Sequence, residues 1–277
     1  MEKQKVMALI DCDSFFVSCE LKRDPSLKGG AVCVISNKDG CAISRSKEAK
    51  KIGVKMGEPL FMIKKNHPKA ICIVADHDYY HQVSEEVMSI IKDFSPYVQI
   101  YSIDEAFVDF TGLRKYYKKN YYKLAKYLRE QILQKTDIPV SIGISSTKTL
   151  AKLASDKAKF KEDGIYLISN KKIPKELNKT KIEEIWGIGR RLSLKMRQFG
   201  ILYANELVKK SDSFLNKEFG IHGLEMKNEL LGISVSPIIN DVSTPKSIQN
   251  TRAFGLFTSD FEFIKNELFK HVHTSCK

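Results

Sequence analysis

Residues 98–110 read VQIYSIDEAFVDF. The runs VQIYS and AFVDF are rich in β-branched and aromatic residues and are separated by only three residues, so the stretch predicts a β-hairpin. The separating residues include two adjacent carboxylates, Asp104 and Glu105. A charged side chain resists leaving water. Either both carboxylates are turn residues with their heads in solvent, or the hairpin holds them for a chemical purpose.

The segments on either side of this hairpin predict the fold. A short apolar run, VMALID at 6–11, is typical of a buried strand, and it ends in Asp11. A helix is predicted over 78–95, where apolar residues recur at helical spacing and a proline follows. A second helix over 122–133 and a further strand over 138–145 come after the hairpin.

The predicted order is therefore strand, helix, two antiparallel strands, helix, strand, when the insertion between the first strand and the first helix is set aside. This is the split βαβ, or ferredoxin-like, pattern of the α+β class. In that topology the strand that ends at Asp11 lies beside the hairpin. Asp11, Asp104 and Glu105 are thus expected to converge, although about 90 residues separate the first from the others.

The insertion and the segment after the sheet differ from the sheet segments in composition and in predicted secondary structure. Residues 31–36, AVCVIS, predict a strand, and residues 46–57 predict a short amphipathic helix that is broken at Gly53 and Gly57. After residue 168 the β-branched runs become rare, which predicts a second, all-helical domain that ends near residue 233.

The C-terminal part contains a predicted linker at 234–247, with two prolines and several small polar residues. A strand at TRAFG (251–255) and an amphipathic helix at 259–273, capped by Asp260 or Ser259, follow it. A lone strand and helix cannot bury the apolar face of that helix. We therefore expect a truncated form or the loss of a further domain.

Composition narrows the class of partner. The chain has 277 residues and a formal net charge of +13, and a field of that sign favours a polyanion such as nucleic acid. A lysine-rich, solvated surface is the alternative. The six cysteines form no CxxC pair, which predicts reduced thiols in the cytoplasm. The first apolar run stops at an aspartate after five residues, so we expect neither a signal peptide nor a membrane partner.

Three converging carboxylates predict a hard divalent cation, Mg²⁺ or Mn²⁺, and phosphoryl transfer as its chemistry. Asp13 could share a face with Asp11, or it could cap the helix that follows it. Lys50 and Lys159 fit a triphosphate, although lysines are most often solvated.

A glycine turn in WGIGRR has two interpretations. Gly187 and Gly189, with Arg190 and Arg191 beside them, could present backbone N–H groups to a phosphate. They could equally form an ordinary turn that packs two helices.

Taken together, these segments resemble the Y-family, or translesion, DNA polymerases, and most closely their UmuC-like branch. The blocks that carry the resemblance stand in the family's order, and they are DCDSFF, SNKDGCAISRSKEAKKIGVKMG, YSIDEAF, TKTLAKLA, WGIGRR and TRAFG. The resemblance implies a palm (1–20 and 76–170) and small fingers (21–75). It further implies a thumb with a helix-hairpin-helix (171–233), a linker (234–247) and the incomplete start of a little finger (248–277).

The resemblance also implies roles for individual residues. Asp11, Asp104 and Glu105 would be the catalytic and metal-binding carboxylates for two metal ions, with the backbone carbonyl of Cys12 as a further ligand. Phe16 matches the steric gate that selects deoxynucleotides. The implied nucleotide-binding residues are Phe15, Phe16, Ser44, Lys50 and Lys159, and the implied DNA-binding residues are Gly187, Gly189, Arg190 and Arg191. Lys47 stands where many relatives outside the UmuC branch carry a tyrosine in the fingers, so the sequence departs from the wider family pattern at this position.

The implied function is damage bypass during DNA repair and the SOS response, by addition of dNTPs to a primer 3′-hydroxyl on a DNA template. A sliding clamp, a RecA-type filament and a UmuD-like subunit are the implied accessory partners. Because the little finger is incomplete, we expect weak DNA binding and poor synthesis. A DNA- or partner-binding fragment without catalysis is the alternative. A nucleotide cyclase would use a similar palm, but the WGIGRR block argues against it.

Overall fold

The computed structural model describes residues 5–38, 40–239, 247–250, 254 and 257–276. It divides into two compact units, Met1–Asn240 and Asp241–Lys277. The predicted boundaries between palm, fingers and thumb stay predictions. None of the described helices is long and apolar enough to cross a membrane.

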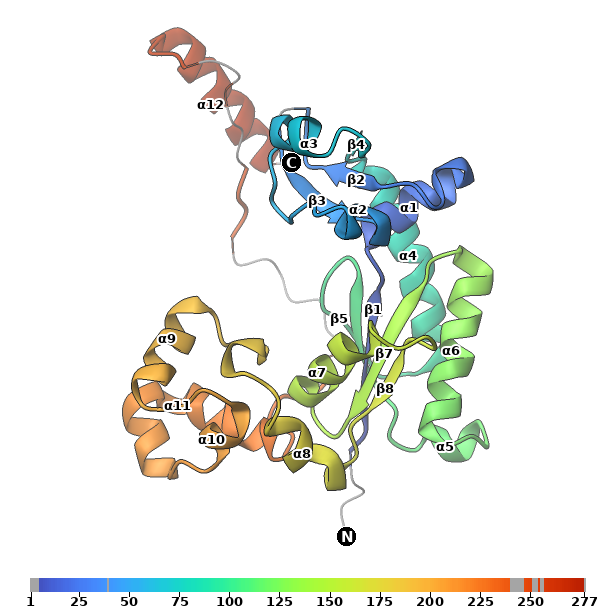
Figure 1. The fold of residues 1–277 in the computed structure, drawn as a ribbon, viewed down its shortest axis with the longest axis vertical. Coiled ribbons are helices and arrows are strands. Elements are labelled where there is room, and N and C mark those ends of the chain that lie inside the picture. Colours follow the sequence, from blue (N-terminus) through green and yellow to red (C-terminus); the bar gives the residue numbers. More distant parts are fainter. Residues whose placement is uncertain (1–4, 39, 240–246, 251–253, 255–256, 277) are drawn as a thin grey trace. The chain divides into compact units, whose positions relative to one another are not determined.

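A five-stranded sheet forms the centre of the first unit (Figure 1). Its strands, in spatial order, are β5 (Val98–Ile100), β6 (Glu105–Asp109), β1 (Met7–Cys12), β7 (Val140–Ser145) and β8 (Ile165–Leu167). β1 pairs antiparallel with both β6 and β7, and β8 joins the edge parallel to β7. The predicted ferredoxin-like order and the predicted hairpin are confirmed.

Helices cover both faces of this sheet, as Figure 1 shows. The helices α4 (His77–Phe94) and α6 (Tyr121–Thr136) lie on one face, and α7 (Lys148–Ala158) lies on the other. Along β1, Ala8 and Ile10 join the core under α4 and α6, whereas Met7 and Leu9 pack with Ala151 of α7. Burial on both sides explains why this strand is continuously apolar rather than alternating.

Gly143 on β7 lets α7 lie directly on the sheet. A Cβ at this position would collide with the backbone of Ala151, Ala154 and Ser155. The close approach places the C-terminal half of α7 above the ends of β1 and β6.

The insertion forms a second, three-stranded sheet. Its strands are β3 (Ala42–Arg45), β2 (Val32–Ile35) and β4 (Ile71–Val74), and its helices are α2 (Lys47–Lys51) and α3 (Leu60–Asn66). It follows α1 (Phe15–Arg23) and η1 (Pro25–Leu27). The predicted strand at 31–36 is confirmed, whereas the helix expected over 46–57 is only one turn long. Gly53 and Gly57 take positive φ angles of 95° and 74°, where glycine is strongly favoured.

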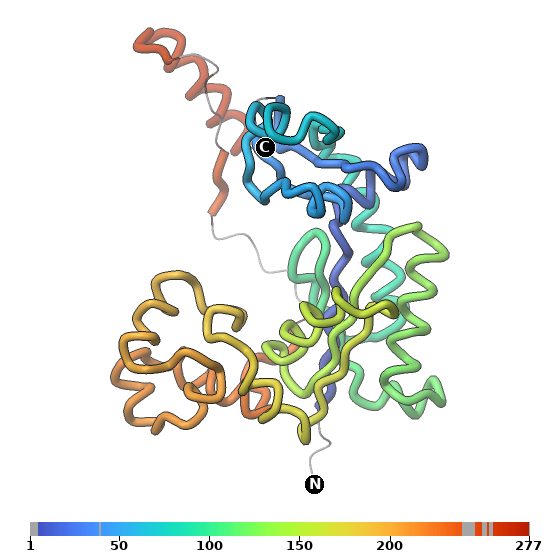
Figure 2. Tube along the Cα trace, viewed as in Figure 1, coloured from blue at the N-terminus to red at the C-terminus, as the bar shows by residue number. Residues whose placement is uncertain are grey.

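A run of helices follows β8 and can be traced in Figure 2. Its elements are η2 (Asn170–Lys172), α8 (Ile173–Leu177), η3 (Ile182–Glu184), α9 (Arg190–Gln198), α10 (Ala204–Val208) and α11 (Asp212–Leu230). The apolar side chains of these helices pack against Leu150, Leu153 and Ala154 of α7. The predicted all-helical segment is confirmed. The small helix α5 (Leu113–Tyr116) precedes α6.

The second unit contains α12 (Phe261–Ser275). The carboxylate of Asp260 accepts hydrogen bonds from the backbone N–H groups of Glu262 and Phe263, which confirms it as the N-cap. The predicted apolar face is exposed along its length, at Phe261, Ile264, Leu268 and Val272. Of the strand expected at 251–255, only Phe254 is among the described residues.

Candidate active site

Two strand ends bring the backbones of the three predicted carboxylate residues together. Asp11 and Glu105 are direct partners in the register of β1 and β6. The backbone N–H of Cys12 donates to the carbonyl oxygen of Asp104 at 2.9 Å, so the pairing continues one residue beyond the strand. The hydroxyl of Ser84 on α4 donates to the carbonyl oxygen of Ile103 at 2.6 Å and holds the hairpin tip.

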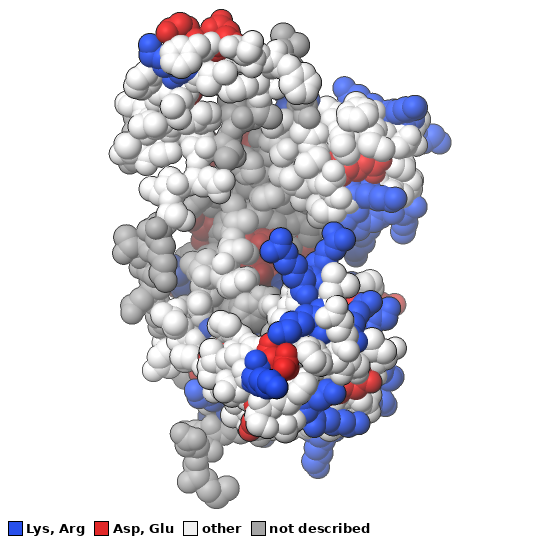
Figure 3. All heavy atoms as spheres, turned by 90° about the vertical axis from the view of Figure 1, so that its left-hand side faces the viewer, with Lys and Arg blue, Asp and Glu red and all other residues white. Residues whose placement is uncertain are grey.

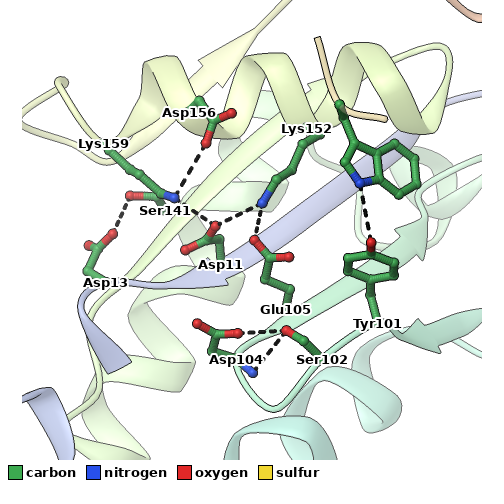
Figure 4. A network of polar contacts seen from close by, with 11 residues as sticks. Asp11, Asp13, Tyr101, Ser102, Asp104, Glu105, Ser141, Lys152, Asp156 and Lys159 are labelled. Carbon is green, nitrogen blue, oxygen red and sulfur yellow. Dashed lines mark hydrogen bonds and ion pairs between the residues drawn. The ribbon is translucent and has the colours of Figure 1, made fainter. Parts of the chain in front are cut away.

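The three side chains do not all point the same way (Figure 4). Those of Asp11 and Glu105 extend toward α7, while the carboxylate of Asp104 accepts a hydrogen bond of 2.6 Å from Ser102. Among the described residues, no three His, Cys, Asp or Glu side chains are clustered closely enough to hold a metal ion. The backbone thus provides the convergence, while the carboxylate of Asp104 lies against Ser102, apart from the other two.

Two lysines from α7 and its C-terminus face these carboxylates. Residues seven apart lie two turns along one helix face, which is why Lys152 and Lys159 reach the same place. The ammonium of Lys152 hydrogen-bonds Glu105 and lies 3.5 Å from Oδ2 of Asp11. The ammonium of Lys159 donates to the same Asp11 oxygen at 2.8 Å and lies 3.4 Å from Asp156.

The electrostatics of the pair favour an added positive charge. Burial, followed by the neighbouring Asp11, raises the pKa of Glu105 to about 7, although Lys152 acts in the opposite direction. Burial alone would lower the pKa of Lys152, but Glu105 and Asp11 outweigh it and the net pKa is raised. Two carboxylates this close therefore stabilise a bound proton or cation between them.

A pocket of about 360 Å³ opens over these carboxylates. All nine residues predicted for the metal and the nucleotide line it, namely Asp11, Cys12, Phe15, Phe16, Ser44, Lys50, Asp104, Glu105 and Lys159. They come from β1, α1, the inserted sheet, the hairpin and the end of α7, so the fold assembles the pocket from segments far apart in the sequence.

Comparison with known proteins places the chain in a family. Residues 10–156 match the model of the impB/mucB/samB family. That match covers more than half of the sequence. The chain belongs to the impB/mucB/samB family.

Individual members of this family and of its wider fold are similar over most of the chain. The protein UmuC of Salmonella typhimurium is 34% identical over 273 residues, which are 96% of this chain and 64% of UmuC. The chain therefore spans slightly less than two thirds of that relative. DNA polymerase IV of Saccharolobus solfataricus is 30% identical over 98% of this chain and 77% of its own length.

A solved Y-family structure has the same fold. The insertion ternary complex of Dbh DNA polymerase is 27% identical, with a TM-score of 0.75, and the match covers 85% of this chain and 70% of that one. The chain thus has the fold of the Y-family polymerases, as its sequence blocks predict.

In this family member two neighbouring rings pack against the ring of Phe16. It stacks on Tyr80 with centroids 4.8 Å apart and meets the edge of His77 at 5.8 Å. The hydroxyl of Tyr80 donates to the buried carboxylate of Glu20 at 2.6 Å. Phe16 is partly exposed to the pocket, whereas Phe15 is buried in the core.

The inserted sheet contacts the turn between β1 and α1. The ammonium of Lys50 donates to the hydroxyl of Ser14 at 3.0 Å, and the hydroxyl of Ser44 donates to the carbonyl oxygen of Ser14 at 3.2 Å. Burial lowers the pKa of Lys50, and the nearby cations Arg45 and Lys159 add to that effect. A polyanion would relieve this crowding of positive charge.

The helix-capping interpretation of Asp13 is wrong. Ser14 is the N-cap of α1, in a left-handed conformation with φ of 47°. The carboxylate of Asp13 instead accepts a hydrogen bond of 2.7 Å from Ser141 on β7, and burial raises its pKa. Asp13 does line the pocket with Asp11.

The predicted DNA-binding residues lie elsewhere. Gly187 has a φ of 89°, and Gly189 is the N-cap of α9, so the glycine turn is real. Arg190 and Arg191 are exposed on α9, outside the pocket lining given by the described residues. On the face seen in Figure 3, Lys and Arg side chains are more widespread than Asp and Glu side chains.

Sequence reasoning missed several basic residues at or beside the pocket. Lys152, which is not among the lining residues, contacts two carboxylates directly, and Arg45, Arg129 and Lys161 line the cavity. Lys152 lies within the TKTLAKLA block at seven-residue spacing from Lys159. That spacing was the signal that could have found it.

Proposed function

We propose that this chain is a template-directed DNA polymerase of the translesion type, which adds a deoxynucleotide to a primer 3′-hydroxyl and releases pyrophosphate. One observation carries the proposal. A single pocket brings Asp11 and Glu105 beside the cations Lys50 and Lys159 and the aromatic ring of Phe16. Membership of the family and the likeness to a ternary complex of Dbh DNA polymerase support it.

The donor set fits Mg²⁺ or Mn²⁺. Asp11, Asp104, Glu105 and the carbonyl of Cys12 supply oxygen atoms only, which hard cations prefer. The Cys12 thiol belongs to the apolar core, and burial raises its pKa, so it is not a competing thiolate ligand. Asp104 would complete the set by turning from Ser102. A pair of such ions, when bound, activates the attacking hydroxyl and neutralises charge on the phosphates.

The residues of the chain itself supply binding and selection. Lys50 and Lys159, with Ser44, would bind the triphosphate of the incoming dNTP. Phe16, stacked on Tyr80, would collide with a ribose 2′-hydroxyl and so exclude ribonucleotides. Gly187, Gly189, Arg190 and Arg191 would hold the phosphates of the primer–template duplex.

The biological setting follows from the same proposal. A cytoplasmic protein that bypasses damaged bases would act on primer–template DNA in the SOS response. Its accessory partners would be a sliding clamp, a RecA-type filament or a UmuD-like subunit. The net charge of +13 suits a DNA ligand.

Single-nucleotide insertion tests the proposal. The full chain is mixed with a primer–template, one complementary dNTP and Mg²⁺, and primer elongation is compared with that of Asp104→Asn. The matched control is Asp109→Asn, which alters a carboxylate at the far end of β6, the strand that begins directly after Asp104. We expect insertion by the wild type and the control and at least a hundredfold loss in Asp104→Asn, by analogy with removal of other electrostatic catalytic groups. Equal, negligible rates in all three proteins would favour a DNA-binding role without catalysis.

A further inference from the structure

Lys152 occupies the place between the two carboxylates that extend toward α7. Its ammonium hydrogen-bonds Glu105 and lies 3.5 Å from Oδ2 of Asp11, as Figure 4 shows. Asp11 and Glu105 are direct register partners on adjacent strands. A cation shared by both side chains would contact the same oxygen atoms that Lys152 contacts.

The burial of the three groups shows why a cation is needed there. The exposed fractions of the side chains are 6% for Asp11, 12% for Glu105 and 18% for Lys152. Two like charges with so little access to water destabilise the fold unless an opposite charge lies close by. Lys159 does not replace Lys152 in this role. Of the two buried carboxylates it contacts Asp11 and not Glu105, and its ammonium also pairs with Asp156.

We propose that Lys152 is the resident counter-ion of the Asp11–Glu105 pair, and that a divalent cation binds there only after this ammonium has moved away. The inference rests on the proposed function, because it assumes that these carboxylates hold the metal. Lys152 is then a positioning residue that keeps the empty site compact and lowers its affinity for metal. Its flexible four-carbon stem permits the movement.

The structure also offers Lys152 a second anion. Asp156 lies four residues further along α7, on the same helix face. An ammonium that turned toward Asp156 would leave oxygen atoms of Asp11 and Glu105 available. The ammonium of Lys152 can therefore move from the Asp11–Glu105 pair to Asp156 on its own helix.

Mn²⁺ binding to the free protein tests this inference. The unbound Mn²⁺ is followed by its electron paramagnetic resonance signal in wild type, Lys152→Met and Lys157→Met. Lys157 is the matched control because it lies on the same helix and pairs with a carboxylate outside the site, Glu176. An adjacent unit charge changes the proton affinity of a carboxylate by about one to three powers of ten. We therefore expect Mn²⁺ to bind about tenfold more tightly to Lys152→Met and equally well to the control.

Thermal unfolding gives a second measurement. In chelator, Lys152→Met should unfold at a lower temperature than the wild type, and Mn²⁺ should raise the unfolding temperature of the variant more than that of the wild type. Lys152→Gln serves in its place if the methionine variant does not fold, since glutamine removes the charge and retains a hydrogen-bond donor.

The outcomes separate this inference from the function it rests on. Mn²⁺ binding that Asp11→Asn abolishes, but that neither Lys152 variant strengthens, would overturn the counter-ion role alone. Mn²⁺ binding that Asp11→Asn leaves unchanged would overturn the metal site itself, and the counter-ion role with it.

Discussion

Removal of the Tyr80 hydroxyl should weaken the fold beneath the proposed steric gate. This hydroxyl donates to Oε1 of Glu20 at 2.6 Å, and both residues are buried, with 0% and 4% of their surfaces exposed. A hydrogen bond to a charged group contributes about 1.5–3 kcal/mol, and a buried acceptor left without its donor adds to the loss. We expect Tyr80→Phe to lower the free energy of unfolding by about 2 kcal/mol.

The neighbouring Tyr79 is a matched control. Its hydroxyl lies 3.4 Å from the carbonyl oxygen of Cys19, which is at the long end for a hydrogen bond. Its ring also carries the guanidinium of Arg23, 3.9 Å from the ring centroid, and phenylalanine would keep that contact. Tyr79→Phe should therefore change the free energy of unfolding by less than about 0.5 kcal/mol.

Thermal unfolding followed by circular dichroism measures both variants. For a protein of this size, about 2 kcal/mol corresponds to a decrease in Tm of roughly 4–8 °C. Because Tyr80→Phe retains the ring that stacks on Phe16, the preference for dNTP over rNTP should not change. An equal decrease in Tm for the two variants, or no decrease for Tyr80→Phe, would refute the assignment of the Glu20 hydrogen bond as a support of this site.

Three further predictions test the packing, the helical segment and the gate. Gly143→Ala should destabilise the fold by about 3 kcal/mol, because the new methyl group meets the backbone of α7. Urea unfolding measures this loss against the control Gly189→Ala, whose new methyl group has open space and which should lose under about 1 kcal/mol. Equal losses of stability in the two variants would contradict the prediction. The pKa of Glu176 is lowered from 4.5, because its bonds to Lys157 and Tyr166 outweigh burial, so its contribution to stability is present above about pH 4.5 and is lost as the pH falls through the lowered pKa. Glu176→Gln should therefore flatten the decline of Tm in acid, and an unchanged slope would show that these contacts add nothing. Phe16→Ala should reduce the preference for dNTP over rNTP in single-nucleotide insertion by about 10- to 200-fold, whereas a constant ratio would exclude Phe16 as the gate.

The sheet could be predicted because its signals are local and mutually consistent. The runs around Asp104 and Glu105 and the continuous apolar run of β1 fix strand type, and the helix periods of 78–95 and 122–133 leave few topologies. Register followed from the fold, so the convergence of Asp11 with Glu105 was predictable without coordinates. The short strands β3 and β4 were not predicted from the sequence.

The details of the site depended on tertiary contacts that no local pattern contains. Asp13 has the residue type and the position of an N-cap, but Ser141, which is 128 residues away, binds its carboxylate instead. The seven-residue spacing puts Lys152 on the same helix face as Lys159, but the close approach of α7 to the sheet at Gly143 is what places Lys152 beside two carboxylates. The turn of Asp104 toward Ser102 is likewise a rotamer choice that the sequence does not specify.

The location of bound metal tests the central claim most directly. Crystals of the chain with primer–template DNA, a non-hydrolysable dNTP and Mn²⁺ would be measured for anomalous scattering from manganese. The account predicts Mn²⁺ peaks at about 2.1 Å from oxygen atoms of Asp11, Glu105 and Asp104, with the triphosphate contacting Lys50 and Lys159. Manganese bound away from these carboxylates, in a complex that contains both DNA and nucleotide, would contradict it.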